Sequence, residues 1–379
     1  MMQKEYIGRN TITKLKKILH KHNPKKIFLV IGKSSYEKSG AKGVIERILK
    51  DYKVIHFSDL KANPEISSIE KGFKVFKENN CDFVIAVGGG SAMDTAKLIN
   101  IFAANEGNPI EYIEKKKNIG KKGKTFVAVP TTSGSGSEAT KFAVVNIGKT
   151  KKSLESDFII PDYAIVDPQL TMSLPKYITA STGMDALSQA IESYWSINST
   201  RKSKKFSVKA IKLILKNLPD SVNSPSKKSR EAMAMAANLA GKAINITKTT
   251  ACHSISYPMT SYFNVAHGHA VALTLAEMLI YNSQVTEKDI LDKRGVSYVK
   301  KTVNEIAKLL GARNTKDACN KINNLMNEIG LSTRLRDLEI KRNKSIEIII
   351  KNGFNPDRVK NNPRRLTEKA LRKILNDIR

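Results

Sequence analysis

The first half of the chain alternates short apolar runs with longer amphipathic stretches. Runs rich in β-branched and aromatic residues predict strands at Ile27–Ile31, Val54–Phe57, Phe83–Val87 and Phe126–Pro130. Strands that alternate with helices are typical of a parallel, doubly wound sheet. Because such sheets bind ligands at the carboxyl ends of their strands, we expect a ligand site at that end of an α/β domain.

The second half has the pattern of helices alone. Apolar residues three and four positions apart predict long amphipathic helices, for example over Lys202–Leu218 and Arg230–Ile244. Pro168 stands near the point where the pattern changes. We therefore expect an α/β domain over residues 1–170 and an all-α domain over residues 171–379.

Two loops rich in glycine and small hydroxyl residues follow neighbouring predicted strands. Gly88–Ser91 opens a helix after the third strand, and Pro130–Thr140 follows the fourth. Glycines let backbone N–H groups approach a pyrophosphate, and a helix N-terminus favours its charge. One such loop also fits an ordinary turn, but the pair favours a dinucleotide lying across both. The candidate cofactor-binding residues are Gly89, Gly90, Ser91, Asp94, Thr131 and Thr132.

A group of carboxylate, amide and imidazole side chains in the second half indicates a metal site. Asp185 and Gln189 are four residues apart and so share one face of a predicted helix. His253, His267 and His269 follow, although the whole chain has only six histidines. Carboxylate and imidazole ligands suit Fe²⁺ or Zn²⁺. A single histidine in a helical region is more often structural, which is how we interpret His269.

The charge and the cysteine content limit the classes of protein to which this chain can belong. The chain has 65 Lys and Arg against 35 Asp and Glu, a formal charge of +30. This excess fits a nucleic-acid binder, a protein that attracts anionic substrates, or a basic surface alone. The basic residues are spread out without interleaved aromatics, so we expect no nucleic-acid partner. Three separated cysteines argue against disulfides, and no apolar run could span a membrane or serve as a signal peptide. We expect a cytoplasmic protein.

Several segments resemble the iron-containing alcohol dehydrogenase family, which has the dehydroquinate synthase-like fold. They are GGGSAMDTAK, PTTSGSGSE, AIVDPQLTMSLP, TGMDALSQAIESY, ACHSISYPMTSYFNVAHGHAVAL and NNPRRLTEKALRKIL. They occur in the family's order and cover essentially the whole chain. The resemblance implies a nucleotide-binding α/β domain, a helical metal-binding domain, and metal-dependent, NAD(P)H-linked reduction of an aldehyde.

The chain departs from the family pattern at two positions. The family has Asp and His at the positions of Asp185 and Gln189, and histidines at His253 and His267. Gln189 is a weaker donor than imidazole, so it either ligates poorly or leaves three ligands, and both Fe²⁺ and Zn²⁺ stay open. Tyr257 replaces a histidine implicated in proton transfer in many members. Its phenol, or a water with the cofactor ribose, would relay the proton instead.

The resemblance also bears on the cofactor. Many family members have an acidic residue that disfavours a 2′-phosphate, and Lys33 aligns with it here. A cation there would favour NADPH over NADH. We expect Lys151 to contact the cofactor as well.

A lysine lies close to the ligand histidine in the sequence. Lys248 lies among Thr247, Thr249 and Thr250, shortly before His253. These side chains could bind a phosphonate or carboxylate on the substrate, although a lysine in solvent with packed threonines fits equally well. The chain most resembles the branch that reduces phosphonoacetaldehyde to 2-hydroxyethylphosphonate. The next expectation is a reductase of a carboxylated semialdehyde or of a simple short-chain aldehyde. A dehydroquinate-synthase-like lyase and a nucleic-acid-binding protein are more remote alternatives. A homodimer is a possible assembly.

Overall fold

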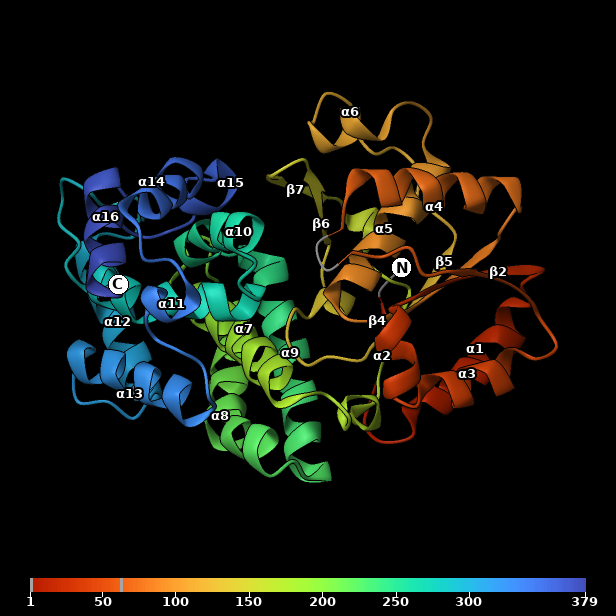
Figure 1. Cartoon of the computed structure of the whole chain (residues 1–379), viewed down its shortest axis with the longest axis horizontal. Coiled ribbons are helices and arrows are strands. Elements are labelled where there is room, and N and C mark those ends of the chain that lie inside the picture. Colours follow the sequence, from red (N-terminus) through yellow and green to blue (C-terminus); the bar gives the residue numbers. More distant parts are fainter. Residues whose placement is uncertain (1–2, 62–63) are drawn as a thin grey trace. The chain divides into compact units, whose positions relative to one another are not determined.

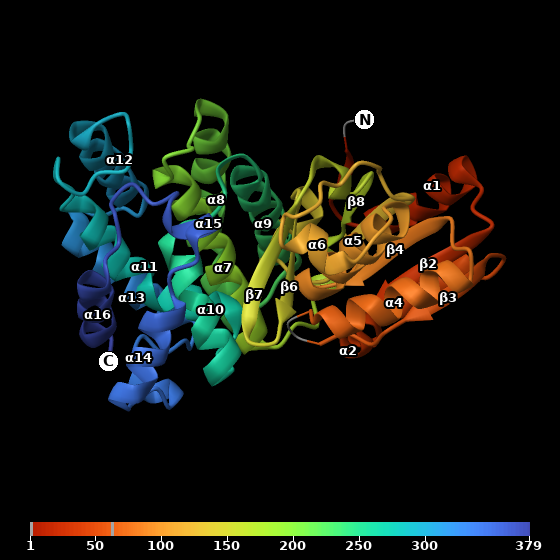
Figure 2. The same cartoon turned by 90° about the horizontal axis from the view of Figure 1, so that it is seen from above.

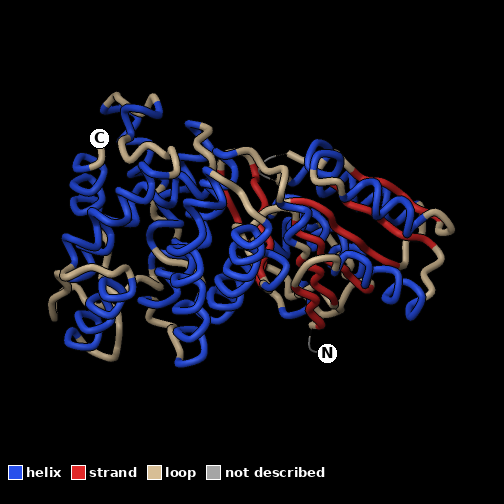
Figure 3. Tube along the Cα trace, turned by 90° about the horizontal axis from the view of Figure 1, so that it is seen from below, coloured by secondary structure: helices blue, strands red, loops and turns tan. Residues whose placement is uncertain are grey.

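The computed structural model describes residues 3–61 and 64–379 of the chain, except for the side chain of Lys33. The chain forms two compact units, Met1–Leu174 and Pro175–Arg379. Among the described residues, the strands all belong to the first unit, and the second consists of helices and loops (Figure 3). This arrangement confirms the predicted fold class, an α/β domain followed by a helical domain.

The first unit is built on a six-stranded parallel sheet. In spatial order its strands are β1 (Lys4–Ile7), β8 (Tyr163–Val166), β5 (Thr125–Pro130), β4 (Phe83–Gly88), β2 (Lys26–Ile31) and β3 (Lys53–Phe57). Its helices are α1 (Lys14–His22), α2 (Lys33–Lys38), α3 (Ala41–Leu49), α4 (Ile66–Glu78), α5 (Gly90–Ala104) and α6 (Pro109–Ile113). The four predicted strands are confirmed as β2, β3, β4 and β5.

Helices cover both faces of this sheet. Phe28 and Val30 of β2 belong to one hydrophobic core, with α4 and α5, whereas Ile27 and Leu29 belong to another, with α1 and α3. Figure 1 shows these helix pairs on opposite sides of β2 and β4. Successive side chains of a strand point to opposite faces, so a strand covered on both sides is apolar at every position. This is why these strands are visible in the sequence as continuous apolar runs.

The strands missed by the sequence analysis are short or polar. β1 and β8 have four residues each, and β1 lies at a sheet edge. An antiparallel hairpin of β6 (Phe142–Ile147) and β7 (Thr150–Glu155) lies outside the main sheet, and Figure 2 shows its two strands side by side. β7 is largely exposed and rich in lysine, so it lacks the apolar pattern of a buried strand.

The second unit consists of helices arranged around α7. They are α7 (Lys176–Trp195), α8 (Arg201–Asn223), α9 (Lys227–Thr247), α10 (Ala251–Phe263), α11 (His267–Ser283), α12 (Val296–Leu309), α13 (Thr315–Glu328), α14 (Asn343–Asn352), α15 (Pro356–Val359) and α16 (Glu368–Asp377). Short 3₁₀ helices occur at Thr11–Thr13, Ser137–Ala139, Asp157–Ile159, Pro168–Thr171 and Leu335–Leu338. α7 packs against α8, α9 and α11 and is buried along most of its length. The polar side chains that it carries inward therefore need partners.

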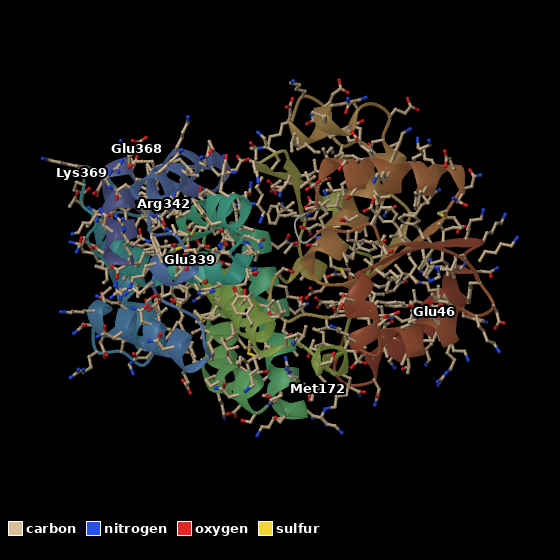
Figure 4. The ribbon with its side chains drawn as sticks, viewed as in Figure 1. Glu46, Met172, Glu339, Arg342, Glu368 and Lys369 are labelled. Carbon is tan, nitrogen blue, oxygen red and sulfur yellow. The ribbon has the colours of Figure 1, made fainter. Side chains whose placement is uncertain are left out.

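Charged side chains on the outer helices lie in solvent. On α16, Leu371 and Leu375 are buried while Glu368 and Lys369 are exposed. Figure 4 shows the last two at the outer side of the second unit. In the described parts of the chain, no helix combines the length and the apolar character needed to cross a membrane.

The three cysteines are free thiols, and all three are buried. Burial raises the pKa of Cys81 to about 11 and that of Cys319 to about 12, because the apolar surroundings disfavour the thiolate. The pKa of Cys252 is also raised by burial. None of the three is a reactive thiolate at neutral pH.

Candidate metal centre and cofactor loops

Three helices of the second unit bring three of the predicted metal ligands together. Asp185 lies on α7, His253 on α10, and His267 is the first residue of α11. One ligand atom from each lies within 4.8 Å of the others, and His253 Nε2 is 3.4 Å from Asp185 Oδ1. Donors bound to one ion at about 2.0–2.2 Å lie up to about 4.4 Å apart, so a small side-chain adjustment fits the three to one ion.

Gly268 allows α11 to begin this close to α7. A Cβ atom at Gly268 would lie 2.0 Å from the carbonyl oxygen of Ser181 and 2.8 Å from Cβ of Asp185. The backbone N–H of His269 donates to Ser181 Oγ at the same contact. Any side chain at position 268 would push the start of α11, and His267 with it, away from Asp185.

Gln189 offers a fourth donor atom at this site. It lies one turn after Asp185 on α7, so both side chains share one face of the helix. Its Oε1 atom is buried and, among the described residues, has no hydrogen-bond partner. A buried amide oxygen without a donor is costly, and a bound cation would satisfy it. The available donors, a carboxylate, two imidazoles and an amide oxygen, therefore fit a divalent ion such as Fe²⁺ or Zn²⁺.

Changing the amide donor should change the affinity for metal. We expect Gln189→His to tighten Zn²⁺ binding by about tenfold or more, because imidazole is the better donor, and Gln189→Leu to weaken it by a similar factor. The dissociation constants can be measured by competition with a chromogenic chelator. An unchanged constant in Gln189→Leu would mean that the ion is held by three ligands.

Glu192 is a functional residue that the sequence analysis missed. It lies on α7 two turns after Asp185, is fully buried, and its carboxylate bonds to His253 Nδ1. It also accepts hydrogen bonds from Thr250 Oγ1 at 2.8 Å and from the backbone N–H of Cys252 at 2.9 Å. A carboxylate on Nδ1 leaves Nε2 of the imidazole to face a metal. Burial alone would lower the pKa of His253, but Glu192 and Asp185 outweigh it and raise the pKa to about 10 in the metal-free site.

Tyr257 lies beside the metal ligands. It follows His253 by one turn of α10, and the centroid of its ring is 6.3 Å from that of His267. Its phenol oxygen accepts a hydrogen bond of 3.1 Å from Nε of Arg358, and both side chains are buried. The predicted role of Tyr257 as a proton relay stays a prediction.

Lys248 has an unusual backbone conformation. It follows the last residue of α9 with φ 62° and ψ 172°, a region that almost only glycine adopts. Together with Lys360 it lines an open pocket of about 560 Å³. The other residues that line this pocket are Ile197, Asn198, Ile246 and Asn361. A lysine held at a strained position marks a candidate for function.

His269 is a structural residue, in line with its interpretation from the sequence. It is buried, with Nε2 2.7 Å from the carbonyl oxygen of Ser332 and Nδ1 3.3 Å from the hydroxyl of Tyr177. Burial lowers its pKa. Its ring is therefore engaged away from the metal ligands.

In the first unit, the carboxyl ends of β2, β4 and β5 are tied to one another. The backbone N–H of Gly32 donates to Val87 O at 3.1 Å, and that of Thr131 donates to Gly88 O at 2.9 Å. From β2 the chain runs to β3 at one edge, and from β4 it runs to β5 in the other direction. Ligands of open α/β sheets bind at such a reversal of strand order.

The glycines of the first loop allow it to pack against the second. A Cβ atom at Gly90 would lie 2.9 Å from Ser135 Oγ, and one at Gly89 would lie 3.4 Å from the Thr132 side chain. Thr131 Oγ1 and Ser133 Oγ are buried and have no hydrogen-bond partner within the described chain. Buried hydroxyls without partners fit a site for a polar ligand.

Asp94 and Lys97 of α5 join the two loops. Asp94 accepts hydrogen bonds from Ser137 Oγ at 2.6 Å and from the backbone N–H of Val144 at 3.0 Å. Lys97, which sequence reasoning missed, donates to the carbonyl oxygens of Ser137 at 2.7 Å and Thr140 at 2.9 Å. Burial lowers the pKa of Lys97 to about 8. These contacts fix the second loop, so a direct contact between Asp94 and ribose stays a prediction.

The remaining predicted cofactor residues lie on three different elements of the first unit. Ser91 is partly buried in the first turn of α5. Lys151 lies on β7 and acts electrostatically on Asp94. Lys33 begins α2 directly after Gly32, and its side chain lies outside the described residues.

A parallel α/β unit with paired small-residue loops, joined to a helical unit with a carboxylate–histidine centre, is the architecture of a metal-dependent nucleotide-binding enzyme. Residues 3–168 match the iron-containing alcohol dehydrogenase profile, and residues 179–378 match the C-terminal profile of the Fe-containing alcohol dehydrogenase family. The chain therefore belongs to the iron-containing alcohol dehydrogenase family. Enzymes of this family are metal-dependent, NAD(P)-linked alcohol dehydrogenases and aldehyde reductases.

Individual relatives differ in their substrates. The chain is 37% identical to long-chain-alcohol dehydrogenase 1 of Geobacillus thermodenitrificans over 64% of its length, an alignment that spans 62% of that enzyme. It is 32% identical to phosphonoacetaldehyde reductase of Streptomyces viridochromogenes, over 78% of this chain and 76% of that one. The structure resembles sulfoacetaldehyde reductase from Bifidobacterium kashiwanohense in complex with NAD⁺, with a TM-score of 0.86, 30% identity, and coverage of 99% and 96% of the two chains. These similarities do not favour the phosphonoacetaldehyde branch over the others.

Proposed function

We propose that this enzyme reduces a small anionic aldehyde to its primary alcohol, with phosphonoacetaldehyde as the first candidate substrate and NADPH as the preferred reductant. The aldehyde carbon gains a hydride from C4 of the reduced nicotinamide, and its oxygen gains a proton, so the products are the alcohol and the oxidised cofactor. The choice of NADPH rests on the sequence position of Lys33.

In the proposed reaction, different residues of the second unit would bind the metal ion and supply the proton. Asp185, His253 and His267, with Gln189 as a fourth donor, would hold the divalent ion, which when bound polarises the carbonyl as a Lewis acid. Tyr257, whose ring lies near that of His267, would supply the proton that the product oxygen needs.

The strained backbone of Lys248 carries the proposal that the substrate is anionic. A residue in this region of φ and ψ costs about 1–3 kcal/mol unless it is glycine, and such strain persists where it serves function. Lys248 and Lys360 share one open pocket, so two positive charges lie where an anionic group could bind. Two of the similar proteins described above are reductases of phosphono- and sulfo-substituted aldehydes, which agrees with this choice.

An aldehyde panel tests the proposed function. We expect protein reconstituted with Fe²⁺ or Zn²⁺ to reduce phosphonoacetaldehyde with a kcat/KM at least about 100-fold above that for propanal, and NADPH to have a lower KM than NADH. Succinate semialdehyde and sulfoacetaldehyde distinguish the other anionic substrates. A preference for propanal or longer neutral aldehydes would assign the chain to the neutral branch instead.

Lys248→Gly separates the strain from the function. Glycine adopts this conformation freely, so the midpoint of thermal unfolding should not fall, whereas the KM for phosphonoacetaldehyde should rise by about tenfold or more. The KM for propanal should stay within about threefold of the wild type. A fall in stability with no change in KM would make Lys248 a structural residue.

A further inference from the structure

Lys97 is a buried cation surrounded by oxygen atoms at the end of the second loop. It lies on α5, its side chain is 1% exposed, and its Nζ is within hydrogen-bond distance of five oxygen atoms. Three are the carbonyl oxygens of Ser137 at 2.7 Å, Thr140 at 2.9 Å and Phe142 at 2.8 Å. The other two are the hydroxyls of Ser137 at 3.0 Å and Thr140 at 3.1 Å. We call these five atoms the oxygen cage. An ammonium group has three N–H donors, so the cage uses all of them.

The charge of Lys97 keeps together carbonyl groups that would otherwise repel one another. Three carbonyl dipoles that converge on one point place their negative ends side by side, which is costly in a buried environment. The ammonium compensates for this repulsion. Asp94 and Glu138 in turn act electrostatically on Lys97 and offset the cost of burying its charge. Without the ammonium, we expect the backbone from Ser137 to Phe142 to move apart.

The oxygen cage fixes one end of the second loop, and the sheet fixes the other. At the sheet, the backbone N–H of Thr131 donates to the last carbonyl of β4 at 2.9 Å. At the cage, the backbone N–H of Ser137 donates to Ser135 Oγ at 3.3 Å. Ser135 is also the residue against which Gly90 of the first loop packs. The loop consists mainly of glycine and small hydroxyl residues, so these contacts, and not apolar packing, determine its shape.

We propose that Lys97 is a positioning residue of the dinucleotide site, which acts on cofactor binding through the second loop. This inference rests on the proposed function, in which the two loops bind NADPH. Thr131 Oγ1 and Ser133 Oγ lie in this loop, buried and with no hydrogen-bond partner among the described residues, so they are available to a polar ligand. A loop that already has its binding conformation loses less conformational entropy when the cofactor binds, and therefore binds it more tightly.

Lys97→Met tests the proposal in the full-length protein, because methionine is unbranched like lysine but carries no charge. In the metal-free protein, we expect the dissociation constant of NADPH, measured by fluorescence titration, to rise by about tenfold or more. In the metal-loaded enzyme, the KM for NADPH should rise by a similar factor. The KM for the aldehyde at saturating NADPH and the dissociation constant of Zn²⁺ should stay within about threefold of the wild type. A residue that only stabilised the fold would not affect the cofactor selectively.

Asn100→Leu is the matched control. Asn100 lies one turn after Lys97 on the same helix and is also buried. Its side chain makes two hydrogen bonds of 2.8 Å with the backbone of Lys124, one as donor and one as acceptor. Lys124 directly precedes β5, so it lies at the end of this strand that is opposite to the second loop. Asn100→Leu should therefore lose thermal stability and bind NADPH as the wild type does.

Ser137→Ala decides the question if Lys97→Met does not fold, as judged by its thermal unfolding. It removes one hydroxyl of the oxygen cage, which also donates to Asp94 Oδ1 at 2.6 Å. We expect this smaller change to raise the dissociation constant of NADPH by about threefold or more. An unchanged constant in folded Lys97→Met, or in Ser137→Ala where Lys97→Met is unfolded, would overturn the proposal. An equal rise in Asn100→Leu would overturn it as well.

The two proposals fail in different ways. If the wild-type protein binds neither NADPH nor NADH, the proposed function is wrong and the role of Lys97 falls with it. If the wild type binds NADPH and Lys97→Met binds it equally well, the function stands and Lys97 is a structural residue only.

Discussion

Replacing His267 with alanine is expected to remove the bound metal and the reductase activity together. The change leaves Asp185 and His253 without the third donor of the cluster and opens the site at the start of α11. Without Lewis-acid polarisation of the carbonyl, kcat/KM should fall by about 10³-fold or more. Metal content after dialysis, measured by atomic emission, and activity at increasing Fe²⁺ concentration check both parts of the prediction.

His269→Gln is the matched control for this experiment. His269 lies two residues further along α11 and is buried, but its ring bonds to Ser332 and Tyr177. This variant should lose some thermal stability and keep its metal. Wild-type metal occupancy in His267→Ala would remove that histidine from the set of ligands.

Glu192→Leu is expected to weaken both the metal site and the fold. Leucine cannot accept the hydrogen bonds from Cys252 N and Thr250 Oγ1, and it leaves the ring of His253 without its orienting partner. Loss of such a partner typically lowers metal affinity by about 10- to 100-fold. Breaking a buried ion pair typically lowers the free energy of unfolding by about 3–5 kcal/mol.

The loss of stability caused by Glu192→Leu should depend on pH when the protein is free of metal. The pKa of His253 is about 10 in the folded, metal-free state, above its unfolded value of about 6.5. The ion pair of His253 with Glu192 therefore contributes fully to the free energy of unfolding below pH 6.5, and this contribution disappears as the pH rises towards 10. Urea unfolding of chelator-treated protein should show a larger deficit for Glu192→Leu at pH 6 than at pH 9.5. A deficit that does not change with pH would contradict the pairing.

Glu277→Leu distinguishes this effect from the loss of any buried carboxylate. Glu277 is a partly buried acid of α11 that accepts a hydrogen bond from Cys319 Sγ, and burial raises its pKa. Its replacement should change stability modestly and leave the affinity for metal unchanged.

The sequence predicts the strands of this fold where burial on both faces makes them continuously apolar. β2, β4 and β5 lie inside the sheet and were visible for that reason. β1 could not be recognised in this way, because its four residues KEYI lie at an edge of the sheet and begin with two charged side chains. β7 could not be recognised in the sequence, because it is a strand through its pairing with β6 and not through its own composition.

The candidate site is predictable only in part, because sequence reveals ligand types but not the contacts that position them. Asp185, His253 and His267 were recognisable by residue type and by resemblance. Glu192 repeats the helical spacing that begins at Asp185, so a third acidic or polar position on one buried helix face was an available signal. Arg358 gave none, because its contact with Tyr257 joins positions 101 residues apart.

The buried cysteines make this enzyme convenient for site-specific labelling. Since Cys81, Cys252 and Cys319 are inaccessible and their raised pKa values keep them as thiols, maleimide reagents at neutral pH should leave the native chain largely unmodified. A single cysteine introduced at an exposed position, such as Lys300 on α12, would then be the one group that carries a fluorophore or spin label. Ligand-induced motions could be followed in the otherwise unmutated protein, without first removing the thiol next to His253.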